Sequence, residues 1–456
     1  MAKEEQNPAN APLVKERLVE QRPTRSLAES VQQLTKYGGF DFIKTVVDGT
    51  ENMDPSKKAR KSIFLTEEDN KPDRKKLKKR LQDFAQLLSA HDNVADMIAE
   101  AEQKATSASQ TLKKNLATVL TETEELEASY RSLSLFFENA ESEKIKNLVL
   151  FDAGNDQTTD ADGFSNPTGI FEQVAKELRD GYDKLDLSEN YSLLVLPGWL
   201  KKNTIVDKWA SLAHQNKVML LTDYRHLDDP DSVEATFERD KLTGADPHKA
   251  NVMMPCNWIV GREAYTELGQ EEHLYVSPAM ALAGMLWGGH IAQPSAGVQH
   301  GKLKMASGVR FSMRKGEIAQ LEDKGLIPMV YEYGRVIPFS AKTLFNGDNV
   351  GLQTYSVVRV FDWIGKVFQD FLNRRTFENI DNKMLEEIKG QVASFLATIR
   401  GPGKIIEDFS GLDIRRHPTN PTHVIVNVKL KPFFPAKVFE INLTGTKGQW
   451  DSDLKQ

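Results

Sequence analysis

The sequence predicts an α/β protein, α+β overall, in which a central mixed or parallel sheet carries helices, a helical region precedes it and a β-hairpin follows it. Three observations predict this class. Apolar runs alternate with amphipathic helical patterns between residues 146 and 223, residues 73–140 keep a helical pattern without glycine, and apolar side chains alternate near the C-terminus. Strands and helices that alternate at this spacing form βαβ units, which build largely parallel sheets.

The N-terminal part divides into a tail and a helical region. Residues 1–60 are polar and contain Pro8, Pro12 and Pro23, so we expect a tail that becomes ordered only on a partner. Residues 61–144 form the helical region, which opens with a basic run at residues 71–80. That run has no aromatic residue for stacking on bases, so we interpret it as a solvated helix face and expect no nucleic-acid binding.

Residues 145–345 are predicted to be the α/β domain. We expect strands at residues 146–151, 191–196 and 218–223, the first of them buried, and helices between them. Two further elements follow: a helix rich in small residues at 277–289, with Gly284 inside it, and a strand with a loop at 326–336. Small residues permit a helix to approach another element closely.

Residues 346–456 are predicted to form a C-terminal domain with two helices. The helix at 355–372 has a strongly apolar face that includes Phe361 and is predicted to be core, which leaves Asp362, Lys366, Gln369 and Asp370 outward. The helix at 381–398 is stopped by glycines around Pro402.

A terminal β-hairpin is predicted after these helices. Residues 424–430 alternate apolar and polar side chains, and residues 438–443 form the second strand. The linker at 431–437 contains Pro432 and Pro435, so the loop is longer than a tight turn.

No motif specifies a catalytic or metal site. The nine histidines are scattered without metal-ligand spacing, and the one cysteine, Cys256, has apolar neighbours that predict a buried, inert thiol. Acidic residues beginning at Asp223 follow the third predicted strand, where ligands of α/β proteins bind, but we interpret them as a loop that leads into a helix. We therefore expect no cofactor and no enzyme activity.

The amino-acid composition limits which partners and which cellular compartment we expect. The 456 residues include 40% hydrophobic and 27% charged residues, and the formal net charge is -6. A mildly acidic chain is a poor general nucleic-acid binder. The longest weakly polar stretch, residues 276–289, is too short to span a bilayer. With one cysteine, these features predict a cytoplasmic protein of two or three domains without membrane insertion.

Three blocks, in this order, resemble the large sheath subunit of type VI secretion systems, the TssC/VipB family. Residues 126–133 (LEASYRSL) resemble its LEaaWRGL block, residues 276–284 (VSPAMALAG) resemble a helix of contractile tail sheaths, and residues 424–434 (VIVNVKLKPFF) resemble the family's terminal hairpin. Tyr130 and Ser132 stand where the family usually has Trp and Gly, which points to a divergent branch such as the type VI subtype of Bacteroidota.

The resemblance implies a contractile tail-sheath-like fold and a structural role. The large subunit would pair with a small TssB/VipA-like subunit, with Leu126, Tyr130 and Leu133 packing against the partner. The pairs would stack with neighbouring copies around an Hcp-like inner tube on a baseplate. Contraction would propel the tube into a target cell, and a ClpV-like ATPase would disassemble the contracted form.

Two assembly elements are expected on the C-terminal part. A helical lattice needs a non-closing interface, and open strand edges supply one by accepting strands from other chains. The strand-exchange residues are Val424, Val426, Val428, Leu430, Val438, Phe439, Ile441 and Leu443. The resemblance also implies a helix facing the tube, for which we choose the charged residues Asp381, Lys383, Glu386, Glu387 and Lys389.

Two other function classes remain open on the sequence. One is a metabolic α/β enzyme with its site at strand ends near Asp152, Asn155 and Asp223. The other is a helical scaffold or adaptor that uses residues 73–140.

Overall fold

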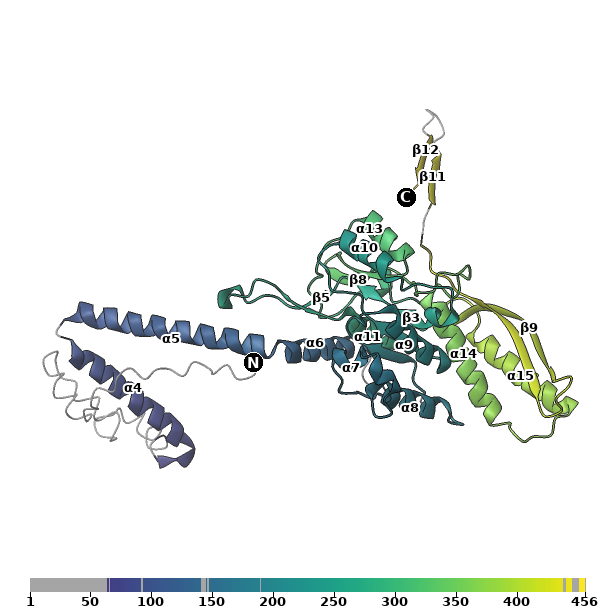
Figure 1. The fold of residues 1–456 in the computed structure, drawn as a ribbon, viewed down its shortest axis with the longest axis horizontal. Coiled ribbons are helices and arrows are strands. Elements are labelled where there is room, and N and C mark those ends of the chain that lie inside the picture. The colour runs from purple at the N-terminus through teal and green to yellow at the C-terminus, as the bar shows by residue number, and fades with distance from the viewer. Residues whose placement is uncertain are drawn as a thin grey trace, which may run out of the picture. The chain divides into compact units, whose positions relative to one another are not determined.

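The computed structural model describes residues 64, 66–91, 93–140, 145, 147–188, 190–437, 440–444 and 451–455. The chain groups into two compact units, Met1–Thr123 with Tyr265–Gln270, and Glu124–Ala264 with Glu271–Gln456. Figure 1 shows the helices and strands of both. The tail expected at residues 1–60 lies outside the described residues.

Helices dominate the described part of the first unit. Its elements are η3 (Glu68–Asn70), α4 (Lys71–Ala90), α5 (Val94–Glu122) and η7 (Thr266–Leu268). Pro72 lies in the first turn of α4, where its missing N–H costs no helical hydrogen bond. The Asn93 side chain caps α5 by accepting a hydrogen bond from the Asp96 N–H at 2.9 Å. The predicted helical pattern therefore forms helices that begin at recognisable start signals.

A parallel sheet lies at the centre of the second unit. In spatial order it contains β1 (Leu193–Leu196), β2 (Met219–Thr222) and β3 (Val252–Met253). α9 (Asn203–Gln215) connects β1 to β2, and α8 (Ile170–Tyr182) precedes β1. The register pairs Leu193 with Met219 and Leu220 with Val252. The strands and helices predicted between residues 171 and 223 are confirmed.

Five strands between residues 255 and 338 form two further sheets. They are β4 (Pro255–Cys256), β5 (Ile259–Arg262), β6 (Leu274–Val276), β7 (Ile327–Glu332) and β8 (Arg335–Pro338). β4 runs parallel to β7, whereas β7 with β8 and β5 with β6 are antiparallel. The mixed character predicted for the sheet is therefore confirmed.

The buried strand predicted at residues 146–151 is wrong. Residues 147–151 belong to no strand, and the side chains from Leu148 to Phe151 are 37–62% exposed. Ile145, just before them, packs on the same apolar cluster as Leu193 of β1. An apolar run becomes a strand only when another strand satisfies its backbone groups, and no described strand pairs with this one.

The main core of the second unit forms around Trp209 of α9, which is fully buried. Its indole N–H donates to the Thr158 carbonyl at 3.0 Å, and its ring meets Phe171 edge-on at 4.8 Å. Buried aromatic side chains of this kind stabilise a core through area and through ring geometry. This core fixes the helices that cover the parallel sheet.

Two helices of the second unit, α6 (Glu124–Asn139) and α11 (Pro278–Gly288), pack side by side (Figure 1). A Cβ added at Gly284 would come within 2.4 Å of the Phe136 carbonyl oxygen. Glycine there permits a backbone-to-backbone approach that no side chain would allow. The small-residue helix predicted at 277–289 is confirmed.

The C-terminal part is a layer of helices against a hairpin. Its elements are α14 (Tyr355–Asn373), α15 (Asn382–Ile399), β9 (Ile406–Arg416) and β10 (Val424–Pro432). β9 and β10 are antiparallel, and β9 contacts α15 (Figure 1). Ile364, Leu396, Ile406 and Val426 join one apolar cluster across these elements. Both predicted helices are confirmed.

A C-terminal β-hairpin is confirmed, but the pairing predicted between residues 424–430 and 438–443 is wrong. β10 pairs with β9, at Val426 opposite Ile414. β9 is hard to recognise in the sequence because Asp408, Gly411 and Asp413 interrupt its apolar pattern, and only contact with α15 reveals its inner face.

A second strand pair follows β10 and is separated from it by a linker that contains Pro435. It consists of β11 (Glu440–Thr444) and β12 (Asp451–Lys455). These strands are antiparallel, with Ile441 opposite Leu454. Val438 and Phe439 lie outside the described residues.

The remaining short elements connect these layers. They are α7 (Asn155–Thr158), η5 (Asp162–Ser165), α10 (Pro230–Asp240), η6 (Pro247–Asn251), α12 (Gly297–His300) and α13 (Lys315–Asp323). No helix within the described ranges is both long and apolar enough to cross a bilayer.

Candidate assembly surfaces

α6 has one face in the core and one in solvent. Ser132 and Leu135 are buried, and Ser132 is small where the helix approaches its neighbours. Leu126 and Tyr130, four residues apart and so on one face, are 72% and 69% exposed. Leu133 is half-buried. Of the residues predicted to contact the small subunit, Leu126 and Tyr130 are therefore accessible together.

An ion-pair network fixes the rotation of α6. Glu127 Oε1 accepts hydrogen bonds from Arg131 Nε and Arg262 Nε, both at 2.8 Å, and Arg131 also donates to the Gly261 carbonyl at 2.9 Å. Burial opposes ionisation of Glu127, but hydrogen bonds from the two arginines lower the pKa of this carboxyl. The sequence reasoning missed this network, although Glu127 and Arg131 have the spacing of a helical ion pair.

Exposed apolar side chains continue just after α6. The extended residues 148–151 include Leu150, which is 62% exposed. β1 has one neighbour among the described strands, β2, so its other edge lacks a described strand partner. The Tyr191 carbonyl, just before β1, accepts a hydrogen bond from the Lys366 ammonium at 2.6 Å.

The predicted strand-exchange side chains of β10 face inward. Val424, Val426, Val428 and Leu430 are half-buried and pack on the apolar cluster of α14 and α15. Among the described strands, β9 and β10 each have one neighbour, so each has an edge without a described strand partner. A strand from a neighbouring copy would therefore bind to the backbone edges of this hairpin and not to these side chains. Ile441 and Leu443 lie in β11.

The charged residues predicted to face the tube are all exposed on or beside α15. Asp381 is the cap of this helix and accepts a hydrogen bond from the Met384 N–H at 2.7 Å. Glu387 contacts Arg375 at 3.2 Å. Glu386 and Lys389 form no ion pair with the described residues, and exposed charges of this kind are screened by salt and released at little cost.

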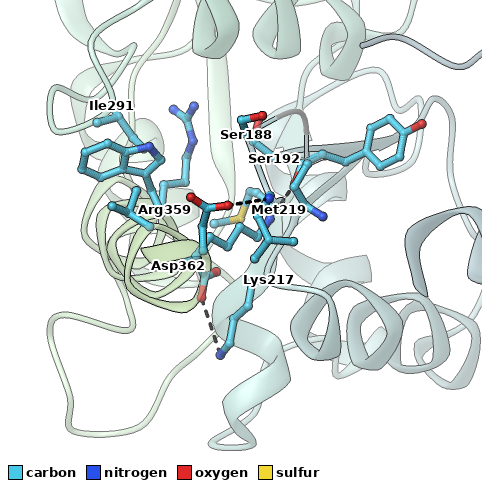
Figure 2. A pocket seen from close by; sticks show the side chains of 14 residues that line it. Ser188, Ser192, Lys217, Met219, Ile291, Arg359 and Asp362 are labelled. Carbon is cyan, nitrogen blue, oxygen red and sulfur yellow. Dashed lines mark hydrogen bonds and ion pairs between the residues drawn. The ribbon is translucent and has the colours of Figure 1, made fainter. Parts of the chain in front are cut away.

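α14 lines a cavity of about 320 Å³, shown in Figure 2, whose wall combines apolar and charged side chains. Asp362 and Lys366, predicted to point outward, both line it. Asp362 accepts a hydrogen bond from Asn251 Nδ2 at 2.8 Å, and its carboxylate points toward the Lys217 ammonium at 3.7 Å (Figure 2). Phe361, predicted to be core, is 45% exposed instead.

Burial shifts the pKa values of the charged side chains around this cavity. It raises the pKa of Asp362, and it lowers the pKa of Lys366 to about 8 and that of Arg359 to about 10. Arg359 donates a hydrogen bond to the Leu286 carbonyl at 2.9 Å. Asp362 and Lys366 were predicted to point outward because α14 shows one apolar face. The helix is in fact enclosed on more than one side, and on the second side buried charged groups form hydrogen bonds and ion pairs with protein partners.

Asp223 occupies the position of the suspected enzyme site, but its oxygens are fully engaged. Its carboxylate accepts hydrogen bonds from the Gly198 N–H at 2.7 Å, the Ala279 N–H at 2.8 Å and the Ser277 hydroxyl. Burial raises the pKa of Asp223 to about 6. The residue therefore ties the ends of β1 and β2 to the start of α11.

The sequence offered two other residues as candidates for chemistry, Asp152 and Cys256. Asp152 is exposed in the segment after α6. Cys256 is buried, and burial raises the pKa of its thiol. Among the described residues, no group of three or more His, Cys, Asp or Glu side chains is arranged to hold a metal ion.

Three family models of type VI secretion sheath proteins match the chain. They are the TssC/VipB-like N-terminal region over residues 27–116, the TssC/VipB central domain over residues 118–346 and the TssC/VipB-like C-terminal domain over residues 354–456. No curated protein matches.

Several solved structures are similar. The baseplate of the anti-feeding prophage matches at 16% identity and a TM-score of 0.47, over 69% of this chain and 80% of that chain. The helical sheath of that prophage in its contracted state matches at 18% and 0.47, over 69% and 81%. A sheath tail protein from Desulfitobacterium hafniense matches at 12% and 0.39, over 58% and 61%.

Together the family models and the layered α/β fold define a subunit of a contractile sheath. Specifically, the chain belongs to the TssC/VipB family of type VI secretion systems, and the central-domain model alone covers half of it. The resemblance noted in the sequence is confirmed, and neither the enzyme nor the scaffold interpretation is favoured.

Proposed function

We propose that this chain pairs with a small TssB/VipA-like subunit and that the pairs, stacked with neighbouring copies on a baseplate, build a sheath around an Hcp-like tube. Contraction of the sheath drives the tube into a target cell, and a ClpV-like ATPase recycles the contracted form. In this role the chain is a structural subunit in the cytoplasm and carries out no catalysis.

The observation that carries the pairing is the exposed apolar surface of the second unit. Leu126, Tyr130 and Leu150 are 72%, 69% and 62% exposed. A surface helix ordinarily turns such side chains inward, and two large apolar side chains exposed on one helix face, as Leu126 and Tyr130 are, mark an interaction site. Full burial of each would stabilise a complex by roughly 1.5–3 kcal/mol before the cost of association.

Lattice contacts are proposed to use strand edges. The two hairpins, β9 with β10 and β11 with β12, each leave backbone N–H and C=O groups without a described strand partner. A strand from a neighbouring copy would satisfy these groups, and each hydrogen bond would contribute about 0.5–1.5 kcal/mol. Repeated in every subunit, such links hold the lattice while the globular bodies move.

The tube contact is proposed to use α15. Its exposed charges are suited to contacts that must break during contraction, because screened surface ion pairs contribute only about 0–1 kcal/mol each. The extended sheath is then a kinetically trapped lattice that converts to a better-packed one.

Co-expression with the small subunit tests this function. We expect the isolated chain to be poorly soluble, and the two proteins together to form long hollow tubes visible by negative-stain microscopy. A well-behaved monomer that the partner leaves unchanged, without tubes, would contradict the proposal.

A further inference from the structure

A hollow of about 560 Å³ in the second unit belongs to none of the surfaces that the proposed sheath function uses. It lies where the end of α11, the residues around α12, the loop before β9 and the residues after β10 meet. Its titratable lining residues are His290, His300, Lys302, Lys304 and Lys404, and its lining contains no Asp or Glu. In a chain of net charge -6, this is a local concentration of positive charge.

The three lysines of the hollow are exposed and form no ion pair with the described residues. Lys324 shows the more usual arrangement, because it contacts both Glu234 and Glu238. Neighbouring ammonium groups repel one another, and a bound anion would turn that repulsion into attraction.

The floor of the hollow does not oppose an anion. The end of a helix exposes carbonyl oxygens with partial negative charge. At the end of α11 two of these oxygens are already occupied: the Met285 carbonyl accepts from the Ser295 hydroxyl at 3.3 Å, and the Leu286 carbonyl accepts from Arg359 at 2.9 Å.

The rim also offers an apolar contact. Phe433 and Phe434 line the hollow just after β10, and Phe434 is 51% exposed. An occupant that satisfies both features carries carboxylates and at least one apolar or aromatic side chain. Nucleic acid fits less well, because binding the phosphate backbone favours an extended basic surface and this chain is acidic overall.

We propose that this hollow binds an acidic segment of a partner polypeptide, with carboxylates at Lys302, Lys304 and Lys404 and an apolar side chain against Phe434. The contact combines charge complementarity, which gives specificity and fast association, with an aromatic anchor. Whether or not the chain forms tubes is a separate readout, so failure of the sheath function and failure of this site are distinguishable.

Binding of fluorescent copolymers to the full chain tests the site. The probes are poly(Glu,Tyr) and poly(Glu) of matched length, with single-stranded DNA and inorganic phosphate as competitors. We expect poly(Glu,Tyr) to bind most tightly, with an affinity that falls as salt is added. The triple reversal Lys302→Glu, Lys304→Glu and Lys404→Glu should weaken it at least tenfold.

Two control variants make the result specific. Reversal of Lys176, Lys208 and Lys315, which are exposed elsewhere on the same unit, changes net charge equally and should leave affinity within twofold. Phe434→Ser should remove the preference for poly(Glu,Tyr) over poly(Glu). Equal loss in both triple variants, no loss in either, or full displacement by DNA would overturn the proposal.

Discussion

Glu127 accepts a hydrogen bond at 2.8 Å from the Nε of Arg262, which lies 135 residues later in the chain. The same carboxylate oxygen binds Arg131 on its own helix. This contact joins α6 to β5 and so determines which face of α6 turns to solvent. The exposure of Leu126 and Tyr130, on which the proposed pairing depends, therefore follows from a partly buried ion pair.

Removing that charge should destabilise the second unit. Glu127→Gln leaves two arginines with a weakened partner, so the free energy of unfolding should fall by about 2–4 kcal/mol. Urea unfolding followed by tryptophan fluorescence measures this, since all six tryptophans lie in the second unit. Glu125→Gln, exposed on the same helix, should change stability by less than about 0.5 kcal/mol. Equal effects of the two changes would contradict this role.

Polar substitution on the exposed face of α6 should abolish pairing. Leu126→Asp with Tyr130→Asp places two charges where an apolar partner surface is expected, while both side chains are already in solvent. Co-purification with the small subunit should be lost, and the unfolding midpoint should stay near that of the wild type. Glu125→Lys, at an exposed position on a different face of the same helix, is the control, and pairing that survives the double change would rule out this surface.

A chain that ends at Lys437 should fold but fail to assemble. β11 and β12 pair with each other, whereas β10 supports the cluster under α15. Loss of residues 438–456 should therefore leave fluorescence-detected stability unchanged and remove tubes from co-expressed samples. Val426→Pro, within β10, should reduce both stability and tube yield. Normal tubes from the shortened chain would show that β11 and β12 take no part in the lattice.

Charge reversal on α15 should weaken assembly on the tube alone. Glu386→Lys with Lys389→Glu keeps the net charge and changes two exposed side chains, and it spares Glu387, whose contact with Arg375 is structural. We expect tube-templated sheath yield to fall several-fold while pairing and stability hold. Unchanged yield, or loss of pairing with the small subunit, would exclude α15 as the attachment helix.

Lys366 should make stability depend on pH in the alkaline range. Its pKa of about 8 in the folded chain lies below the ordinary lysine value near 10.4, so between these values only the unfolded state holds the proton. Wild-type stability should therefore rise relative to Lys366→Met from pH 8 to pH 10, by up to about 3 kcal/mol. Urea midpoints at several pH values measure the difference, with Lys208→Met as the exposed control. Parallel profiles would contradict the assignment.

The local sequence pattern was sufficient to predict the elements that show a clear apolar run or a clear apolar face. The strands at 191–196 and 218–223 are apolar runs bounded by turn residues, and α14 and α15 show one apolar face each. The family blocks at 126–133 and 276–284 belong to α6 and to β6 with α11, and α6 and α11 pack together where Gly284 approaches the Phe136 carbonyl.

By itself, the sequence determined the fold class, the family and the identity of the main helices, because periodicity and residue order are local properties. Only tertiary structure decided that residues 148–151 belong to no strand, that β10 pairs with β9, and that Asp362 and Lys366 turn inward. The reason is physical. Strand pairing and the burial of charge depend on which distant group satisfies each backbone or charged atom, and no local pattern specifies that partner.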